Sequence, residues 1–326
     1  MNQTLDKSTN WSDYYRRAWL KRKKIMSSII DSGERDPLRV ISMLSSMQRL
    51  SESMRGTPKH LDSGSVFDID DYRHDVVEGI RNVTKKENCS EVIVTHQKLL
   101  PSGAPVDVHR VHRDRYYLSS SYTCCDKVDF IADYCRSNKF DAVIELGSGY
   151  CQNLVKLFYK GGPRVPYYGG EFTDSGTDCA KLLSGLCVDF ELIPFKFDFC
   201  KPDLSSIPKY ENVLVFSCHA IEQVNLIPNI LLPVIASVAK QVTCIHLEPF
   251  GFQMVSPGND NDQHKDHRDY FHENDWNVNL VSQLISLNRV KTIDLQYLAK
   301  NIMGGDDPRN PTSLALWKSD NRNCPL

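Results

Sequence analysis

The sequence has no apolar run long enough to cross a membrane. Its longest apolar stretch, residues 226–238, is interrupted by Pro228 and Pro233. That stretch is shorter than the roughly 20 residues that a spanning helix needs. The first ten residues are polar and lack the apolar core of a secretory signal peptide. We therefore expect a cytoplasmic protein with no membrane partner.

The chain also lacks an excess of positive charge. Its 39 lysine and arginine residues are balanced by 41 aspartate and glutamate residues, and the formal net charge at pH 7 is -2. A protein that holds a polyanion needs a basic surface. Nucleic acid is therefore not expected as a partner, and the basic run at residues 21–24 is interpreted as the solvated face of a helix.

Paired cysteine motifs are missing as well. The eleven cysteines include no C-x-x-C pair, and their odd number and scattered positions fit reduced thiols better than a disulfide framework or a zinc site. Residues 256–273 are rich in histidine and aspartate, but His264, His267 and His272 form no i, i+4 pair. We interpret this segment as a solvated loop and expect no metal cofactor.

The N-terminal part carries helical patterns. Apolar residues recur at three- and four-residue intervals between Trp11 and Ile30, and a second such pattern starts after Asp36 and Pro37. No series of strand patterns is recognised before residue 140. The sequence predicts a mainly helical N-terminal extension or cap over residues 1–110 and a second domain over residues 111–326.

Strand and helix patterns alternate from residue 141 onward. Seven strands with intervening helices imply a mostly parallel sheet that is covered on both faces. The last two strands are joined without a helix, so the seventh strand is expected to run antiparallel. The predicted strands are residues 142–146, 167–172, 190–197, 212–217, 242–247, 292–298 and 313–317, and the predicted helices are residues 153–159, 176–186, 226–238 and 276–287.

A glycine motif follows the first of these strands. The strand pattern ends near Glu145, and glycines stand at Gly147 and Gly149 before a helical pattern starts at Gln152. A dinucleotide fingerprint of the G-x-G-x-x-G type would have its third glycine where Gln152 stands. The order acid, one residue, glycine, one residue, glycine resembles the first motif of class I S-adenosylmethionine-dependent methyltransferases. That motif often carries a third glycine, at the place of Cys151.

The resemblance covers about residues 110–326. It implies an α/β fold with a seven-stranded Rossmann-like methyltransferase sheet and S-adenosylmethionine as cofactor. At the ends of the second and third strands, Glu171 is expected to accept hydrogen bonds from both ribose hydroxyls and Asp198 from the adenine amino group, with Phe199 stacked on the base. The cofactor-binding residues that it implies are Glu145, Gly147, Ser148, Gly149, Glu171, Phe172, Asp198, Phe199 and Ser217.

The fourth strand is followed by His219. The Pro-Pro motif of enzymes that methylate amino groups of nucleic acids is absent here, and so is the ligand aspartate of metal-dependent catechol-type enzymes. A histidine at this place can orient or deprotonate an acceptor, or it can pack against the cofactor, and both interpretations stay open. Glu248, at the tip of the fifth strand, could hold a substrate ammonium group, whereas His246 is expected to be a satisfied core residue. The predicted catalytic residues are His219, Glu222, Glu248 and Tyr122.

Aromatic and arginine residues precede the first motif, in a segment that usually lies against the cofactor in the family that the chain resembles. A surface connector is the alternative interpretation. Aromatic rings could also surround a cationic centre. The predicted substrate-binding residues are Arg113, Arg115, Tyr116, Phe250 and Trp276.

Short strings at residues 219–224, 246–251 and 310–314 look like those of a bacterial branch of small-molecule methyltransferases. We therefore expect methyl transfer to sulfur or nitrogen of a small amino-acid-like metabolite, with methionine as one candidate, by a monomer or homodimer. The alternative is a protein that binds S-adenosylmethionine or another nucleotide without turnover, with the helical extension as a partner surface. A nicotinamide oxidoreductase is disfavoured by the missing third glycine.

Overall fold

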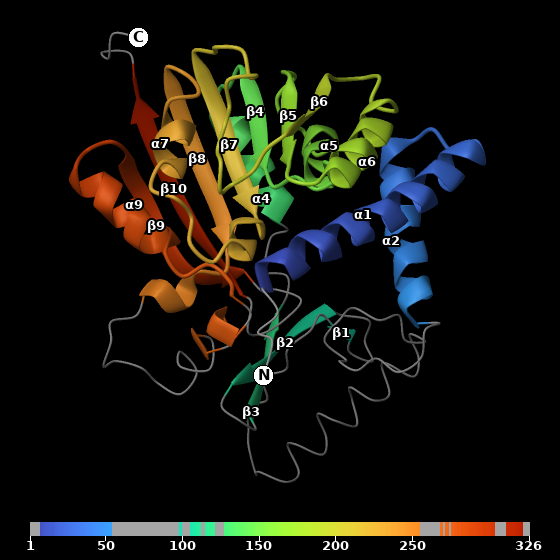
Figure 1. Ribbon diagram of the computed structural model, residues 1–326, viewed down its shortest axis with the longest axis horizontal. Helices are drawn as coiled ribbons and strands as arrows, with labels where there is room; N and C mark the ends of the chain where they lie inside the picture. The colour runs from blue at the N-terminus through green and yellow to red at the C-terminus, as the bar shows by residue number, and fades with distance from the viewer. Residues whose placement is uncertain are drawn as a thin grey trace.

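A seven-stranded sheet forms the centre of the molecule, as the computed structural model shows (Figure 1). Its inner strands are largely buried, and all five residues of the central strand β4 are buried. The structure describes residues 7–53, 98–99, 105–111, 115–120, 127–254, 268–269, 271–273, 275–303 and 311–321.

The strand order is β6-β5-β4-β7-β8-β10-β9. Neighbouring strands from β6 to β8 are parallel, and β10 is antiparallel to both β8 and β9. The seven predicted strands and the reversed last strand are therefore confirmed, and the fold is the Rossmann-like methyltransferase fold. The strands are β4 (Ala142–Leu146), β5 (Tyr167–Glu171), β6 (Leu192–Lys196), β7 (Asn212–Cys218), β8 (Gln241–Glu248), β9 (Asp294–Met303) and β10 (Thr312–Asp320).

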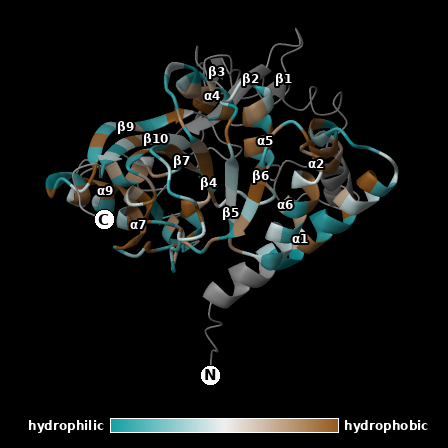
Figure 2. Ribbon diagram, turned by 90° about the horizontal axis from the view of Figure 1, so that it is seen from above, coloured by the Kyte–Doolittle hydropathy of each residue, from teal (hydrophilic) through white to brown (hydrophobic). Residues whose placement is uncertain are grey.

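Helices cover both faces of this sheet (Figure 2). Buried residues of α4, α5 and α6 share one apolar core with α1 and α2, whereas buried residues of α7 and α9 belong to a second core on the other face. The helices are α1 (Lys7–Asp31), α2 (Pro37–Ser53), α4 (Lys127–Ser137), α5 (Gln152–Tyr159), α6 (Asp174–Ser184), α7 (Leu231–Ala236) and α9 (Leu280–Arg289).

One predicted helix is much shorter than expected. The apolar stretch 226–238 forms a helix only over Leu231–Ala236. Proline lacks a backbone N–H and is tolerated only in the first turn of a helix, so the helix starts after Pro228 and holds Pro233 in its first turn. No helix among the described residues has the length and apolar character needed to cross a bilayer.

The region before residue 140 contains strands, so the prediction of a region without them is wrong. A three-stranded antiparallel sheet consists of β1 (Lys98–Leu99), β2 (Pro105–Val111) and β3 (Arg115–Ser120). Strands β2 and β3 follow each other closely in the chain, and their antiparallel pairing supports two segments that are short by themselves. The predicted domain boundary at residue 110 falls inside β2, and the division into two domains stays a prediction.

The N-terminal helices are part of the main core. Met26 and Ile29 of α1 and Val40, Ile41 and Leu44 of α2 are all buried, and they belong to the same core as the residues of α5 and α6. The burial of five such side chains contributes on the order of 1.5–3 kcal/mol each. Helices α1 and α2 therefore complete one face of the sheet.

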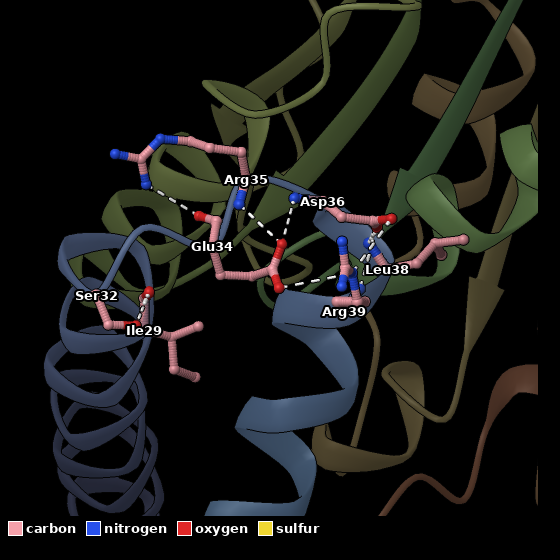
Figure 3. A network of polar contacts seen from close by, with 7 residues as sticks. All are labelled: Ile29, Ser32, Glu34, Arg35, Asp36, Leu38 and Arg39. Carbon is pink, nitrogen blue, oxygen red and sulfur yellow. Dashed lines mark hydrogen bonds and ion pairs between the residues drawn. The ribbon is translucent and has the colours of Figure 1, made fainter.

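Local polar contacts define the turn between α1 and α2 (Figure 3). Gly33 has a φ of 102°, and the Glu34 carboxylate accepts hydrogen bonds from the backbone N–H groups of Arg35 and Asp36. Asp36 Oδ1 then accepts hydrogen bonds from Leu38 and Arg39 N–H at 2.8 and 3.1 Å, which caps α2. The predicted helix start at Asp36 and Pro37 is confirmed.

Candidate functional site

The direction of the chain places a crevice at the carboxyl ends of β4 and β7. From β4 the chain proceeds outward through β5 and β6, and from β7 it proceeds the other way through β8. Ligands of open α/β sheets bind outside the carboxyl ends of the strands at such a switch point. These ends lie at the lower edge of the sheet in Figure 1, where the loops after β4 and β7 meet.

The loop after β4 has an alternating backbone conformation. Gly147, Gly149 and Cys151 have φ values of 77°, 56° and 66°, so every second residue lies in the left-handed region. A Cβ on Gly147 would lie 2.2 Å from the Cβ of Ala220 in the loop after β7. The glycines thus meet both a backbone and a steric requirement, and Cys151 adopts the conformation of the third glycine in the motif.

The amide groups of this loop are bound within the protein. Gly147 and Ser148 N–H donate to the carbonyl oxygen of Gly170 at 2.9 and 2.8 Å, and Cys151 N–H donates to the Ser148 carbonyl. Gly149 N–H donates to Glu171 Oε2 at 3.1 Å. A pyrophosphate is held by free loop amides at a helix N-terminus, and these four amides are not free. The loop is therefore poorly suited to a dinucleotide.

Glu145 lies beneath the loop with one oxygen unsatisfied. Its Oε1 accepts a hydrogen bond from Asn153 Nδ2 at 2.7 Å, while its buried Oε2 has no hydrogen-bond partner among the described residues. The side chain is 1% exposed, and burial raises the pKa of its carboxyl group to about 8. A buried carboxylate of this kind favours a positively charged ligand group.

Glu171 is held by the protein more tightly than the sequence suggests. Its carboxylate accepts hydrogen bonds from Gly149 N–H, Thr173 N–H and Thr173 Oγ1, and it is 6% exposed. Burial raises the pKa of this carboxyl group. Both oxygens were expected to face ribose hydroxyls, but three of about four acceptor positions are occupied by the protein. Glu171 thus orients the glycine loop and the start of α6.

The glycine pair before Glu171 has a packing role. A Cβ on Gly169 would lie 2.2 Å from Cys151 Sγ, and a Cβ on Gly170 would lie 2.8 Å from the Cβ of Phe197. These glycines let the loop after β4 and strand β6 approach β5 closely.

Phe199 lies beside the glycine loop. Its ring is buried, packs edge-to-face on Phe197 and would lie 3.2 Å from a Cβ on Gly147. Asp198 is half-buried, and its Oδ1 accepts a hydrogen bond from Cys200 N–H. The structure therefore brings Asp198 and Phe199 to the switch point.

Three other predicted cofactor residues have different surroundings. Phe172 is 43% exposed, with Lys196 Nζ 5.9 Å from its ring centre. Ser217 pairs with Leu146 just before the glycine loop, but it is fully buried, with its Oγ 3.0 Å from His246 Nδ1. Ser148 is in the loop, but its Oγ faces Cys151 Sγ at 3.5 Å. The hydroxyl groups of Ser217 and Ser148 are thus directed to protein partners, and the role of Phe172 stays a prediction.

His219 is positioned by two polar partners. Its Nδ1 lies 3.2 Å from Glu222 Oε2, and its Nε2 lies 2.7 Å from Thr312 Oγ1. The residue has a φ of 50°, a conformation that costs energy for a side chain other than glycine. His219 is 19% exposed, so part of the ring remains accessible. The ring thus hydrogen-bonds Thr312 and lies at ion-pair distance from Glu222, whose Oε2 accepts no hydrogen bond among the described residues. Thr312 carried no sequence signal, because only the pairing of β10 with β8 brings it here.

Glu248 is more buried than expected for a residue that holds a substrate ammonium group. It is 1% exposed, and its two oxygens accept hydrogen bonds from the backbone N–H groups of Ala220, Ile221 and Glu222. Burial and the neighbouring Glu222 carboxylate raise the pKa of Glu248 to about 7. The carboxylate stabilises the turn after His219 and does not face a substrate ammonium group.

The aromatic residues near this turn are also more buried than predicted. Phe250 is 1% exposed and belongs to the apolar core, although it also lines a small pocket beside Glu222 and Glu248. Trp276 is half-buried and packs edge-to-face on Phe271 at 5.1 Å. His246 is confirmed as a satisfied core residue: it contacts Trp317 Nε1 at 3.0 Å, and burial lowers its pKa to about 3.

The remaining predictions fall on parts that the structure describes little or not at all. Tyr122 and Arg113 lie outside the described residues, as do His264 and His267. Arg115 and Tyr116 belong to β3, where they pair with Val111 and Arg110 of β2. Within the described ranges, no group of three histidine, cysteine, aspartate or glutamate side chains is arranged to hold a metal ion.

No protein-family model and no curated protein matches this chain. Among solved structures, it is similar to a SAM-dependent methyltransferase from Aquifex aeolicus (10% identity, 59% of this chain, 89% of the other, TM-score 0.38). It is also similar to the CcbJ methyltransferase from Streptomyces caelestis (12% identity, 60% and 91%, TM-score 0.40). A third similar structure is the plantazolicin methyltransferase BpumL with a monoazolic desmethylPZN analog and SAH (11% identity, 60% and 82%, TM-score 0.39). At such identities and TM-scores, these similarities do not bear on substrate or reaction.

Proposed function

We propose that this protein is an S-adenosylmethionine-dependent methyltransferase that methylates sulfur or nitrogen of a small amino-acid-like metabolite, with methionine as one candidate. The observation that carries the proposal is the buried Glu145 beneath the glycine loop. Its Oε2 has no hydrogen-bond partner among the described residues, while four amides of the loop are bound within the protein. The site therefore favours a ligand with a positively charged group over one with a pyrophosphate.

The residues present fit the donor. Glu145 Oε2 would accept a hydrogen bond from its ammonium group, which would also satisfy the buried oxygen. Asp198 and Phe199 would bind the adenine, and Glu171 would contribute its remaining acceptor position to the ribose. The donor supplies a methyl group that is already activated on a sulfonium centre. What the protein adds is alignment of the acceptor and exclusion of water.

His219 is proposed as the group that receives the acceptor's proton. An amine or hydroxyl acceptor has to lose a proton, whereas a thioether does not. The Glu222 carboxylate lies 3.2 Å from Nδ1, so we assign Nε2 as the nitrogen that would take the proton, after exchanging the Thr312 hydroxyl for the acceptor. Tyr122, Arg113, Arg115, Tyr116 and Trp276 remain proposed contributors on the acceptor side.

Calorimetric titration tests the donor assignment. We expect the purified protein to bind S-adenosylmethionine and S-adenosylhomocysteine, and to bind NAD at least about 100-fold more weakly, because the amides of Gly147, Ser148, Gly149 and Cys151 already donate within the protein. Glu145→Gln should weaken binding of both ligands, because in the wild type the ammonium group would displace the proton that burial keeps on Glu145, whereas the amide cannot ionise. Absence of any uptake of either ligand by folded protein would contradict the proposal.

Turnover of a labelled donor tests the role of His219. With an acceptor that carries a proton, His219→Ala should lower kcat about 100-fold or more while donor affinity changes less than twofold. His272→Ala is a matched control, because His272 is exposed. Unchanged turnover in His219→Ala with an amine acceptor would remove His219 from catalysis. Donor binding without any labelled product from pooled metabolites would favour the non-catalytic alternative.

A further inference from the structure

Helix α1 contacts the glycine loop directly. The indole ring of Trp19 lies so close to Gly149 that a Cβ on this glycine would be 2.7 Å from the ring atom Cη2. Trp19 also packs edge-to-face on Tyr150, with ring centres 5.8 Å apart. All three atoms nearest to that Cβ belong to Trp19. The absence of a side chain at Gly149 therefore makes room for Trp19.

The position of Trp19 is fixed by neighbouring contacts. Lys23 Nζ forms an ion pair with Asp178 of α6 at 2.8 Å, and Ser175 Oγ donates to the carbonyl oxygen of Arg16 at 3.0 Å. Met26, two turns after Trp19, is fully buried in the core. Helix α1 is thus anchored along α6, and it carries Trp19 to the loop as part of the folded core.

The environment of Trp19 suits a partly cationic ligand. The ring is half-buried, so a part of its surface is not covered by the protein. The Arg22 guanidinium lies over one face, 4.4 Å from the ring centre. Glu145, with its unsatisfied oxygen, lies just before the same loop. An aromatic face that remains uncovered attracts a cationic group.

On the basis of the proposed function, we infer that Trp19 forms a wall of the donor site. The N-terminal helix is then a component of the binding site for the sulfonium donor and does not act only as a cap above a complete catalytic domain. Trp19 covers the glycine loop from the side of α6, where it limits access of water to the bound donor. Removing the ring opens this side of the site.

The experiment is calorimetric titration with S-adenosylhomocysteine. Trp19→Ala should weaken binding about tenfold or more, because a buried aromatic contact with the ligand is lost, and Trp19→Phe should restore most of the affinity. Leu20→Ala is the matched control: it shortens a side chain of the same helix that is 42% exposed, and it should leave affinity within twofold. Thermal unfolding of each variant separates loss of binding from loss of the fold.

A second measurement uses the intrinsic fluorescence of Trp19. Donor binding should change the tryptophan emission of the wild-type protein, and a large part of this change should be missing in Trp19→Phe. Affinity equal to wild type in Trp19→Ala, or an unchanged fluorescence response in Trp19→Phe, would overturn the inference. Tighter binding by Trp19→Ala would overturn it too, since the ring would then occupy the donor's place. Lack of binding by the wild type would instead contradict the proposed function.

Discussion

Gly147, Gly149 and Cys151 show how single residues shape the loop after β4. All three lie in the left-handed region, where a Cβ costs about 1–2 kcal/mol. Gly147 and Gly149 also face neighbours that leave no room for a side chain, namely Ala220 and Trp19. Cys151 adopts the same unfavourable backbone conformation with a side chain, and its Sγ occupies the space next to Gly169. The alternating glycines therefore reflect two separate constraints, one of backbone conformation and one of contact.

Gly147→Ala tests these two constraints. The new Cβ would lie 2.2 Å from the Cβ of Ala220, which is held by its backbone, so the free energy of unfolding should fall by about 3 kcal/mol or more. Gly33→Ala is the control, because Gly33 has a φ of 102° but no atom within 4 Å of the added Cβ. That variant should lose only about 1–2 kcal/mol. Urea unfolding measures the free energy of unfolding of both variants. Equal losses in Gly147→Ala and Gly33→Ala would contradict a steric constraint at Gly147.

The turn after β7 is an element that owes its shape to a buried carboxylate. Glu248, on β8, accepts hydrogen bonds from three consecutive backbone N–H groups that begin the short 3-10 helix Ile221–Gln223. These groups would otherwise be buried without partners. This turn carries His219 and Glu222, whose Nδ1 and Oε2 atoms lie 3.2 Å apart. Glu248 is thus a positioning residue for the His219 dyad.

Glu248→Ala should destabilise the protein by about 3 kcal/mol or more, because several buried N–H groups lose their acceptor. Glu248→Gln, which keeps one carbonyl oxygen, should lose less. Glu211→Ala is a suitable control, since Glu211 pairs with Lys240 at the surface with 69% of its side chain exposed, and its effect should stay within about 0.5 kcal/mol. Urea unfolding curves compare the three variants. A loss for Glu248→Ala no larger than that for Glu211→Ala would contradict the capping role.

At the scale of the whole molecule, buried titratable groups link stability to pH. Burial raises the pKa of Glu145 to about 8 and that of Glu248 to about 7, so the native state holds protons that the unfolded chain releases near pH 4.5. Stability from these groups is fully present below about pH 4.5 and is lost as pH rises through 7 to 8. His246, with its pKa lowered to about 3, acts in the opposite direction, but only below about pH 6.5.

The free energy of unfolding should therefore fall between about pH 5 and pH 8, on the order of a few kcal/mol. Glu145→Gln, which carries no titratable proton, should flatten this slope by about half. Glu211→Gln changes an exposed carboxylate and should leave the slope as it is. Urea unfolding at several pH values measures the slope. A slope in Glu145→Gln equal to that of the wild type would show that Glu145 does not retain its proton in the native state.

The sequence by itself determined the strands of the seven-stranded sheet, although it did not show β1, β2 and β3 or the short extent of α7. The seven strands, the reversed last strand, the glycine loop and the start of α2 follow from local patterns of apolar residues, glycine and proline. Such patterns act within one segment, through backbone preference and the burial of one face. They also located Glu145, Gly147, Gly149, Asp198 and Phe199 at strand ends, because the carboxyl ends of parallel strands share one edge of the sheet.

Only the tertiary structure decided which partner each of these side chains meets. The acceptor positions of Glu248 are occupied by backbone amides, and most of those of Glu171 by Thr173 and Gly149. Phe250 is surrounded by the apolar core. Thr312 reaches His219, and Trp19 reaches Gly149, across long separations in the chain. The physical reason is that such contacts depend on strand register and on how one helix packs on another. A sequence pattern shows the face on which a side chain lies, and packing decides what the side chain touches there.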